Sequence, residues 1–146
     1  MATIGVDCEL LLDGTGYFIK PGTYKMKQPR VRKATVRADS GESYVDLGPG
    51  KRAWSMIVLC MNDLLKYDGT ATGLTGQQYR DALRASYTGS TGTTIQFTDP
   101  LNGTPVAVHF DNYAEVIYDL HVQQVPLATG GTSDLSYEVA IELVEA

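Results

Sequence analysis

The chain has 146 residues, 12 of them Lys or Arg and 17 Asp or Glu, with a formal net charge of −5 at pH 7. This length suits one domain with its own core, and 43% hydrophobic residues argues against wholesale disorder. The acidic balance argues against general nucleic-acid binding by charge, and no stretch approaches the roughly 18 apolar residues of a membrane span, so we expect no membrane partner.

The first residues favour a strand followed by a loop. The opening residues lack a charged segment before an apolar run, so we expect no secretory signal. Residues 6–12 place apolar side chains at every second position, the period of a half-buried strand. Residues 13–16 contain two glycines and are typical of a turn. Residues 17–29 have two prolines, a glycine and no clean period, which indicates a long loop or arm that can include a short strand.

The next segment carries basic side chains on both alternating faces of a strand-like stretch, Arg30–Ala38. Such a strand suits a sheet edge or a surface that a neighbour covers. A turn at 39–42 and a short strand at 44–47 follow, and Gly48-Pro49-Gly50 ends that strand. Residues 54–61 are continuously apolar, which favours a central strand, although a buried helix gives the same pattern.

One helix is expected, over residues 76–87. Thr75 and Gln78 fit a capping box, in which the Thr75 hydroxyl accepts from the Gln78 amide and the Gln78 side chain reaches back. Apolar residues then recur at helical spacing from Tyr79 to Tyr87, and Gly89 can end the helix.

The rest of the chain reads as strands at 93–98, 105–110, 114–125 and 135–145, of which the last alternates most clearly. The sequence therefore predicts a mainly β fold, a β-sandwich or barrel of about eight to ten strands with one flanking helix. We expect a single domain over 1–146 with an extended basic loop or arm at about 13–37. Cys8 and Cys60 lie in apolar strand-like contexts and are expected to be reduced and buried.

Residues that could carry chemistry are sparse. His109 and Asp111 lie two apart, but no third ligand has a diagnostic spacing, so we expect no metal site. Asp111, Glu115 and Asp119 could form an acidic cluster, for which a solvated or lumen-facing surface is a simpler interpretation than a glycosidase pair. Trp54 is interpreted as a core or interface aromatic rather than a stacking platform. Because serine-nucleophile and phosphate-binding motifs are also missing, we expect neither an enzyme nor a cofactor.

Charge is sorted along the chain. Twelve basic and nine acidic residues lie in 1–84, whereas 85–146 has eight acids and no Lys or Arg. Seven basic residues without an intervening acid are Lys20, Lys25, Lys27, Arg30, Arg32, Lys33 and Arg37. The simpler interpretation is a solvated charge distribution, and the alternative is that the basic segment of one copy meets an acidic face of another.

The order of elements resembles the tail-tube and distal-tail family of long-tailed bacteriophages. The similarity lies in Tyr44–Gly48, in Arg52-Ala53-Trp54 opening an apolar strand, in a single capped helix and in the later phrases Ile95-Gln-Phe-Thr-Asp-Pro100 and Tyr137–Leu143. It spans roughly residues 30–145 and contains no catalytic motif.

The resemblance implies a virion protein, made in the host cytoplasm, that forms rings, usually hexameric, with itself and other tail proteins. DNA would pass through the ring without specific binding. The seven basic residues would then form the contact between subunits or rings. The acidic interface or channel face would be Asp111, Glu115, Asp119, Glu138 and Glu142.

The sequence leaves other functions open. A tube, distal-tail or terminator role fits equally well. A capsid decoration or neck protein and a monomeric β-sandwich carbohydrate-binding module are the alternatives, the last of which requires exposed aromatic side chains.

Overall fold

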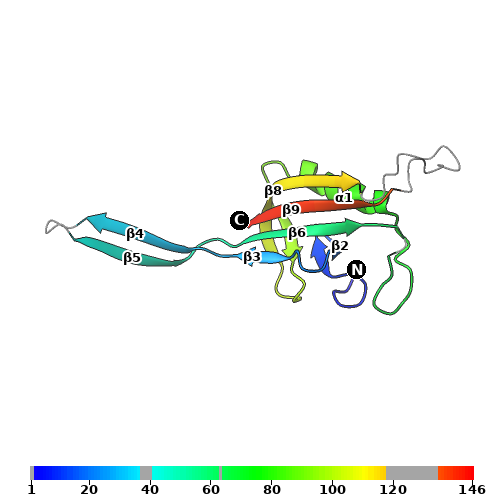
Figure 1. Ribbon diagram of the computed structural model, residues 1–146, viewed down its shortest axis with the longest axis horizontal. Helices are drawn as coiled ribbons and strands as arrows, with labels where there is room; N and C mark the ends of the chain where they lie inside the picture. The colour runs from blue at the N-terminus through cyan, green and yellow to red at the C-terminus, as the bar shows by residue number, and fades with distance from the viewer. Residues whose placement is uncertain (1, 37–40, 63, 118–134) are drawn as a thin grey trace.

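The computed structural model describes residues 2–36, 41–62, 64–117 and 135–146. It confirms a mainly β fold with one flanking helix (Figure 1). The elements are β1 Leu10–Leu12, β2 Thr15–Ile19, β3 Lys25–Lys27, β4 Arg30–Val36, β5 Glu42–Pro49, β6 Ala53–Cys60, α1 Gly76–Gly89, β7 Ile95–Thr98, β8 Val106–Ile117 and β9 Tyr137–Glu145.

The main sheet closes on itself. Its strand order is β2-β1-β7-β8-β9-β6-β3, every pairing is antiparallel, and β2 also pairs with β6 through Phe18–Leu59 and Ile19–Val58. Six strands therefore form a barrel, and β3 continues along β6 beyond the end of β2. Closure leaves few free edges in the body of the protein.

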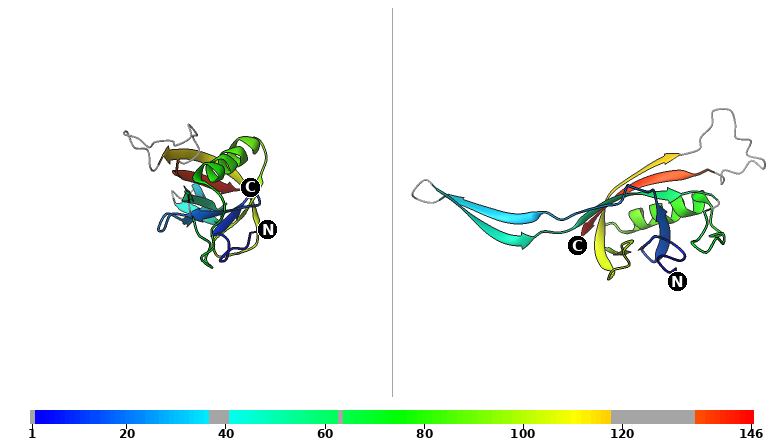
Figure 2. Two further views of the ribbon diagram at one scale, coloured as in Figure 1. Left: turned by 90° about the vertical axis from the view of Figure 1, so that its right-hand side faces the viewer. Right: turned by 60° about the horizontal axis from the view of Figure 1, so that its bottom comes forward.

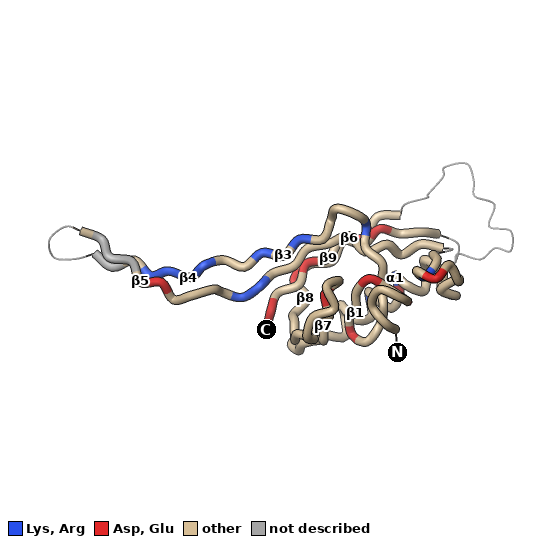
Figure 3. Tube along the Cα trace, turned by 90° about the horizontal axis from the view of Figure 1, so that it is seen from below, with Lys and Arg blue, Asp and Glu red and all other residues tan. Residues whose placement is uncertain are grey.

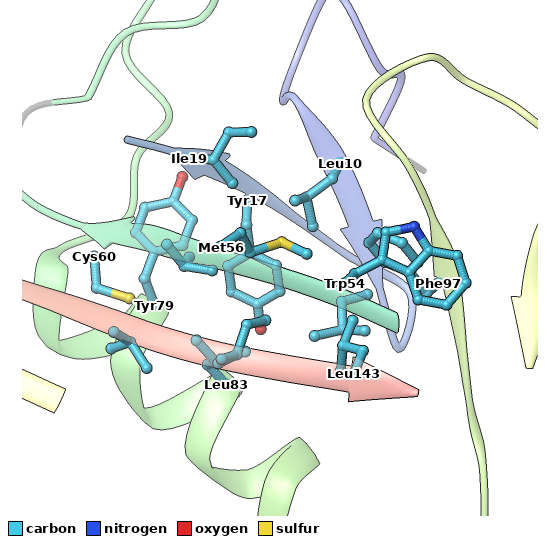
Figure 4. Close-up of a cluster of buried hydrophobic side chains, with 14 of the residues drawn as sticks. Leu10, Tyr17, Ile19, Trp54, Met56, Cys60, Tyr79, Leu83, Phe97 and Leu143 are labelled. Carbon is cyan, nitrogen blue, oxygen red and sulfur yellow. The ribbon is translucent and has the colours of Figure 1, made fainter. Parts of the chain in front are cut away.

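The core fills the barrel and reaches the helix. Alternate residues of β6 are buried, from Trp54 to Cys60, and β9 shows the same period. Figure 4 shows Tyr17, Met56, Tyr79 and Leu83 gathered between the strands and α1. Burying side chains of this size stabilises the fold by about 1.5–3 kcal/mol each. The predictions of a central strand at 54–61 and of buried, unpaired Cys8 and Cys60 are confirmed.

The helix begins as predicted. Thr75 is the N-cap, the capping box with Gln78 is formed, and the helix ends at Gly89, two residues later than expected. The first residue must be small, because a Cβ on Gly76 would lie 2.5 Å from the carbonyl oxygen of Cys60 and 2.7 Å from that of Leu135. The right-hand view of Figure 2 shows α1 lying beneath β6, β8 and β9.

Some segments differ from the prediction. Of the strand expected at 6–12, only Leu10–Leu12 is a strand, and residues 5–7 form a turn. The loop expected at 17–29 contains the end of β2, where Tyr17, Phe18 and Ile19 are all buried. The usual alternation is missing there because Tyr67 packs over Phe18 on the outer side, with ring centroids 6.2 Å apart. The strands expected at 105–110 and 114–125 are one strand, β8, with a bulge between Phe110 and Asn112. Residues 118–125 lie outside the described part of the chain.

A two-stranded hairpin projects from the barrel. β4 and β5 pair only with each other and form a separate sheet. Figures 1 and 2 show this hairpin, residues 30–49 and hereafter the arm, extending along the long axis away from the body. The arm expected at about 13–37 is thus displaced, because 15–19 and 25–27 belong to the main sheet.

Candidate assembly surface

The arm exposes apolar side chains that no described residue of its own chain covers. Val31, Val45 and Leu47 are 41%, 48% and 59% exposed, and the described side chains of β4 are all exposed. A hairpin of two strands is marginally stable in water unless another surface packs on it. The arm therefore has the properties of an interface segment.

Hydrogen bonds fix the root of the arm where it leaves the barrel. The Gly50 amide donates to the Pro29 carbonyl oxygen at 2.6 Å, and Gln28 Nε2 donates to the Gly50 carbonyl oxygen at 2.9 Å. These contacts hold the two chain segments together at the point of exit. They give the arm a defined direction relative to the body.

Just beyond the root, a bulge is stabilised by charge. The register shifts between Val31 and Arg32, which leaves Leu47 without a partner, and Gly48 has φ +89°, a conformation that favours glycine. Arg30 Nη2 binds Asp46 Oδ2 at 2.6 Å, and Asp46 Oδ1 accepts from the Gly48 amide at 2.9 Å. The Arg30 guanidinium and then this amide lower the pKa of Asp46.

The basic run forms a stripe rather than a single loop. Lys20 follows β2 and pairs with Glu138 at 3.3 Å, Lys25 and Lys27 lie on β3, and Arg30, Arg32 and Lys33 lie on the arm. Figure 3 shows the blue segments following β3 and β4. Arg37 is outside the described residues. The linear sorting of basic charge therefore survives folding over these two strands.

The five predicted acidic residues do not form one surface. Glu115 faces α1, Glu138 is paired with Lys20, and Asp111 and Glu142 line the same shallow hollow on the outside of the sheet. Asp119 lies outside the described residues. Among the four described members of the set, the structure brings together only Asp111 and Glu142, because the β8 bulge places Asp111 beside the row of Glu142.

Glu115 holds the helix against the sheet. Arg80 Nε donates to Glu115 Oε2 at 2.8 Å, Arg80 Nη2 to Oε1 at 2.9 Å, and the Tyr113 hydroxyl to Oε2 at 2.7 Å. The Arg80 hydrogen bonds lower the pKa of Glu115 to about 2. The Arg80 guanidinium also lies 5.4 Å from the centre of the Tyr137 ring. The hydrogen-bonding capacity of the Glu115 carboxylate is therefore used within its own chain, and Glu115 is not part of a surface for another subunit.

The residues considered for chemistry have structural surroundings. His109 Nδ1 lies 3.2 Å from the carbonyl oxygen of Thr93, and Trp54 is 3% exposed and packs edge-on against Phe97. Burial raises the pKa of the Cys60 thiol to about 12.

Within the described ranges no three His, Cys, Asp or Glu side chains could hold a metal ion together. No helix of the described part has the length and apolarity to cross a membrane.

Sequence reasoning missed the contacts that cross long stretches of chain. Arg52 Nη2 binds Glu145 Oε2 at 3.0 Å, and its guanidinium lies 5.1 Å from the centre of the Trp54 ring. This joins the returning end of the arm to the last strand. No local spacing signals it, because the partners are 93 residues apart.

A scan against protein-family models found no match for this chain, and a search of curated proteins found none either.

Proposed function

We propose that this chain is a structural subunit that assembles with copies of itself into a ring or tube, as in the tail of a long-tailed bacteriophage. The observation that carries the proposal is the arm. It is a braced hairpin that projects from a closed barrel and exposes apolar and basic side chains. Because hydrogen bonds hold its root in a defined direction, the arm loses less conformational entropy on binding than a freely jointed segment would.

The geometry of the arm favours an open or ring-like assembly. The arm lies at one end of the molecule and projects away from the barrel (Figure 1). When the arm of each copy contacts the barrel of the next copy, the contact is heterologous and generates rings or filaments, whereas a reciprocal exchange of arms would close a two-fold dimer. The net charge of −5 would disfavour adhesion of DNA to such a ring.

The competing functions make different demands on the surface. A sugar-binding module needs exposed aromatic rings that can stack on a sugar. Trp54 is buried, and the exposed rings Tyr67 and Tyr87 already pack against rings of their own chain, Tyr67 against Phe18 and Tyr87 against Phe110 and Tyr113. A capsid decoration or neck protein would use the same arm on a shell instead of on another copy. That role predicts no assembly of the purified chain on its own.

Negative-stain electron microscopy of the wild type and of the triple variant Arg30→Glu, Arg32→Glu, Lys33→Glu tests the proposal. We expect rings or tubes with a central hole from the wild type and dispersed subunits from the variant. Thermal unfolding should show an intact barrel in both, because these residues lie outside the core and the Arg30–Asp46 pair belongs to the arm alone. Unchanged assembly in the variant would contradict a role for the arm.

A further inference from the structure

The outer face of the main sheet carries a groove with a floor of small side chains. Directly paired residues share a face, which places Lys25, Ser55, Glu142 and Asn112 in one row across four strands. The next row is Lys27, Ala53, Val144 and His109. Because Ala53 and Ser55 on β6 are short and their neighbours are long, a hollow of about 290 Å³ lies over them. A second hollow of about 310 Å³ shares Lys25, Ser55 and Glu142 and continues the groove toward Ala140.

The two rims of this outer-face groove have opposite charge. Lys25 and Lys27 on β3 form the basic rim, and Asp111 and Glu142 on β8 and β9 form the acidic rim. Across the described residues, none of these four side chains makes an ion pair or a side-chain hydrogen bond. The rims are therefore available to charges from outside the chain.

The arm has the complementary pattern. Val31, Lys33 and Val45 share one of its faces, because β4 alternates and Lys33 pairs with Val45. Arg30 and Arg32 lie on the opposite face, where Arg30 binds Asp46. One face of the arm thus offers two exposed valines, Val31 and Val45, and Lys33, which is unpaired among the described residues. On the opposite face, the charge of Asp46 is already neutralised by Arg30.

The arm cannot lie in the groove of its own chain. It runs away from the barrel along the long axis, and its root is fixed by the hydrogen bonds of Gln28 and Gly50 (Figures 1 and 3). The occupant that matches the groove is therefore the arm of a second copy.

We infer that the arm of one copy lies in the outer-face groove of the next, with Val31 and Val45 on the Ala53–Ser55 floor and Lys33 toward Asp111 and Glu142. This deepens the proposed function and rests on it. Short side chains on the floor allow the two sheets to approach at the usual separation of about 10 Å. The reverse orientation would place Lys33 against Lys25 and Lys27, and such like-charge contacts disfavour a wrong register.

Exchange of charges across the interface provides the first test. We expect Lys33→Glu and Glu142→Lys each to weaken self-association by about tenfold or more, as measured by sedimentation at several concentrations. The two changes combined should restore it, because the pair is re-formed with its signs reversed. The matched control compares Lys33→Thr with Arg32→Thr, which lies on the opposite face of the same strand and should weaken association less. Absence of rescue, or an equal loss from both threonine variants, would overturn the inference.

Cross-linking between two different variants tests the contact directly. Protein with Val45→Cys is mixed with size-tagged protein carrying Ser55→Cys and treated with a short bis-maleimide. The native Cys8 and Cys60 are buried, so they give little background. We expect a cross-linked heterodimer with Ser55→Cys but not with Ala71→Cys, an exposed loop position at the other end of the body. Equal cross-linking of both partners would contradict the inference.

The same experiments separate the two proposals. If the wild type forms rings or tubes, but charge exchange gives no rescue and Ser55→Cys no specific cross-link, the groove is not the receptor and self-assembly stands. If the wild type is a monomer at every concentration, both proposals are wrong.

Discussion

At the scale of single residues, the Arg80–Glu115 pair makes the strongest statement about stability. Both side chains are mostly covered, and the carboxylate accepts three hydrogen bonds across the helix–sheet contact. Because the pKa of Glu115 falls from its ordinary value of 4.5 to about 2, the folded state favours the ionised form. Stability from this group is present above about pH 4.5 and is lost as the pH falls toward 2.

Glu115→Gln should therefore flatten the acid side of the stability profile. We expect the variant to be about 2–3 kcal/mol less stable than the wild type at neutral pH, with the difference shrinking below about pH 4. Urea unfolding at a series of pH values measures this. Asp81→Asn is the control, because this carboxylate also pairs with Arg80 but is 55% exposed, and the change should have a much smaller effect on stability. A difference in stability that stays constant at all pH values would contradict the lowered pKa of Glu115.

A second residue-scale prediction concerns close approach at the start of α1. Gly76→Ala places a methyl group against two backbone carbonyl oxygens, which we expect to cost about 1–3 kcal/mol in unfolding free energy. Gly89→Ala, at the last position of the same helix, meets nothing within 4 Å and should be neutral or slightly stabilising. Thermal unfolding of both variants measures this difference. An equal change in unfolding temperature would show that the space at Gly76 does not exclude a larger side chain.

Residues that interact locally could be predicted from the sequence, and distant ones could not. The capping box of Thr75 and Gln78 follows from a spacing of three residues. Arg80 lies 35 residues from Glu115, and Glu145 lies 93 residues from Arg52. Packing of α1 on the sheet brings the first pair together, and the register of β6 and β9 brings the second together. The acidic cluster expected around Asp111, Glu115 and Asp119 shows the same limit. The bulge in β8 separates Asp111 from Glu115, and no sequence pattern marks that bulge.

At the scale of elements, strands with one exposed face were predicted well and strands with unusual surroundings were not. β9 alternates cleanly, and its observed start is two residues later than the predicted one. The pattern predicts a loop for the end of β2, because this end is covered on both faces, by the core and by Tyr67, and shows no alternation. The observed arm begins later than the predicted one, because residues 15–19 and 25–27 are strands of the main sheet and Pro21 lies in a turn between them.

The conformation at the root of the arm leads to a prediction about an element. Gly48 and Gly14 both have positive φ, of 89° and 81°, and neither is crowded. Substitution by Ala should strain each position by about 1 kcal/mol. Gly48→Ala should weaken self-association without changing unfolding of the body, because it alters only the arm. Gly14→Ala, in the barrel turn between β1 and β2, should lower the unfolding temperature and leave self-association intact. The opposite pattern would show that the arm is not the contact.

At the scale of the whole molecule, two features combine: a closed barrel with few free edges and an arm that lies outside it. Because the sheet closes, the body pairs its strands and buries its core without a partner. The arm, in contrast, leaves apolar side chains exposed, as is typical of a surface that another molecule covers. The charge sorting seen in the sequence becomes a basic stripe on β3 and β4 and a separate acidic rim on β8 and β9. These are the properties that the proposed assembly from stable subunits requires.

Removal of the arm tests this account most directly. Residues 31–48 are replaced by Asn-Gly, which can close the gap because Gln28 and Pro29 already bind Gly50. The molar mass of this variant and of the wild type is then measured by light scattering over a range of concentrations. We predict a folded monomer for the armless variant and a large, concentration-dependent multiple of the subunit mass for the wild type. A monomeric wild type, or an armless variant that assembles equally well, would contradict the account.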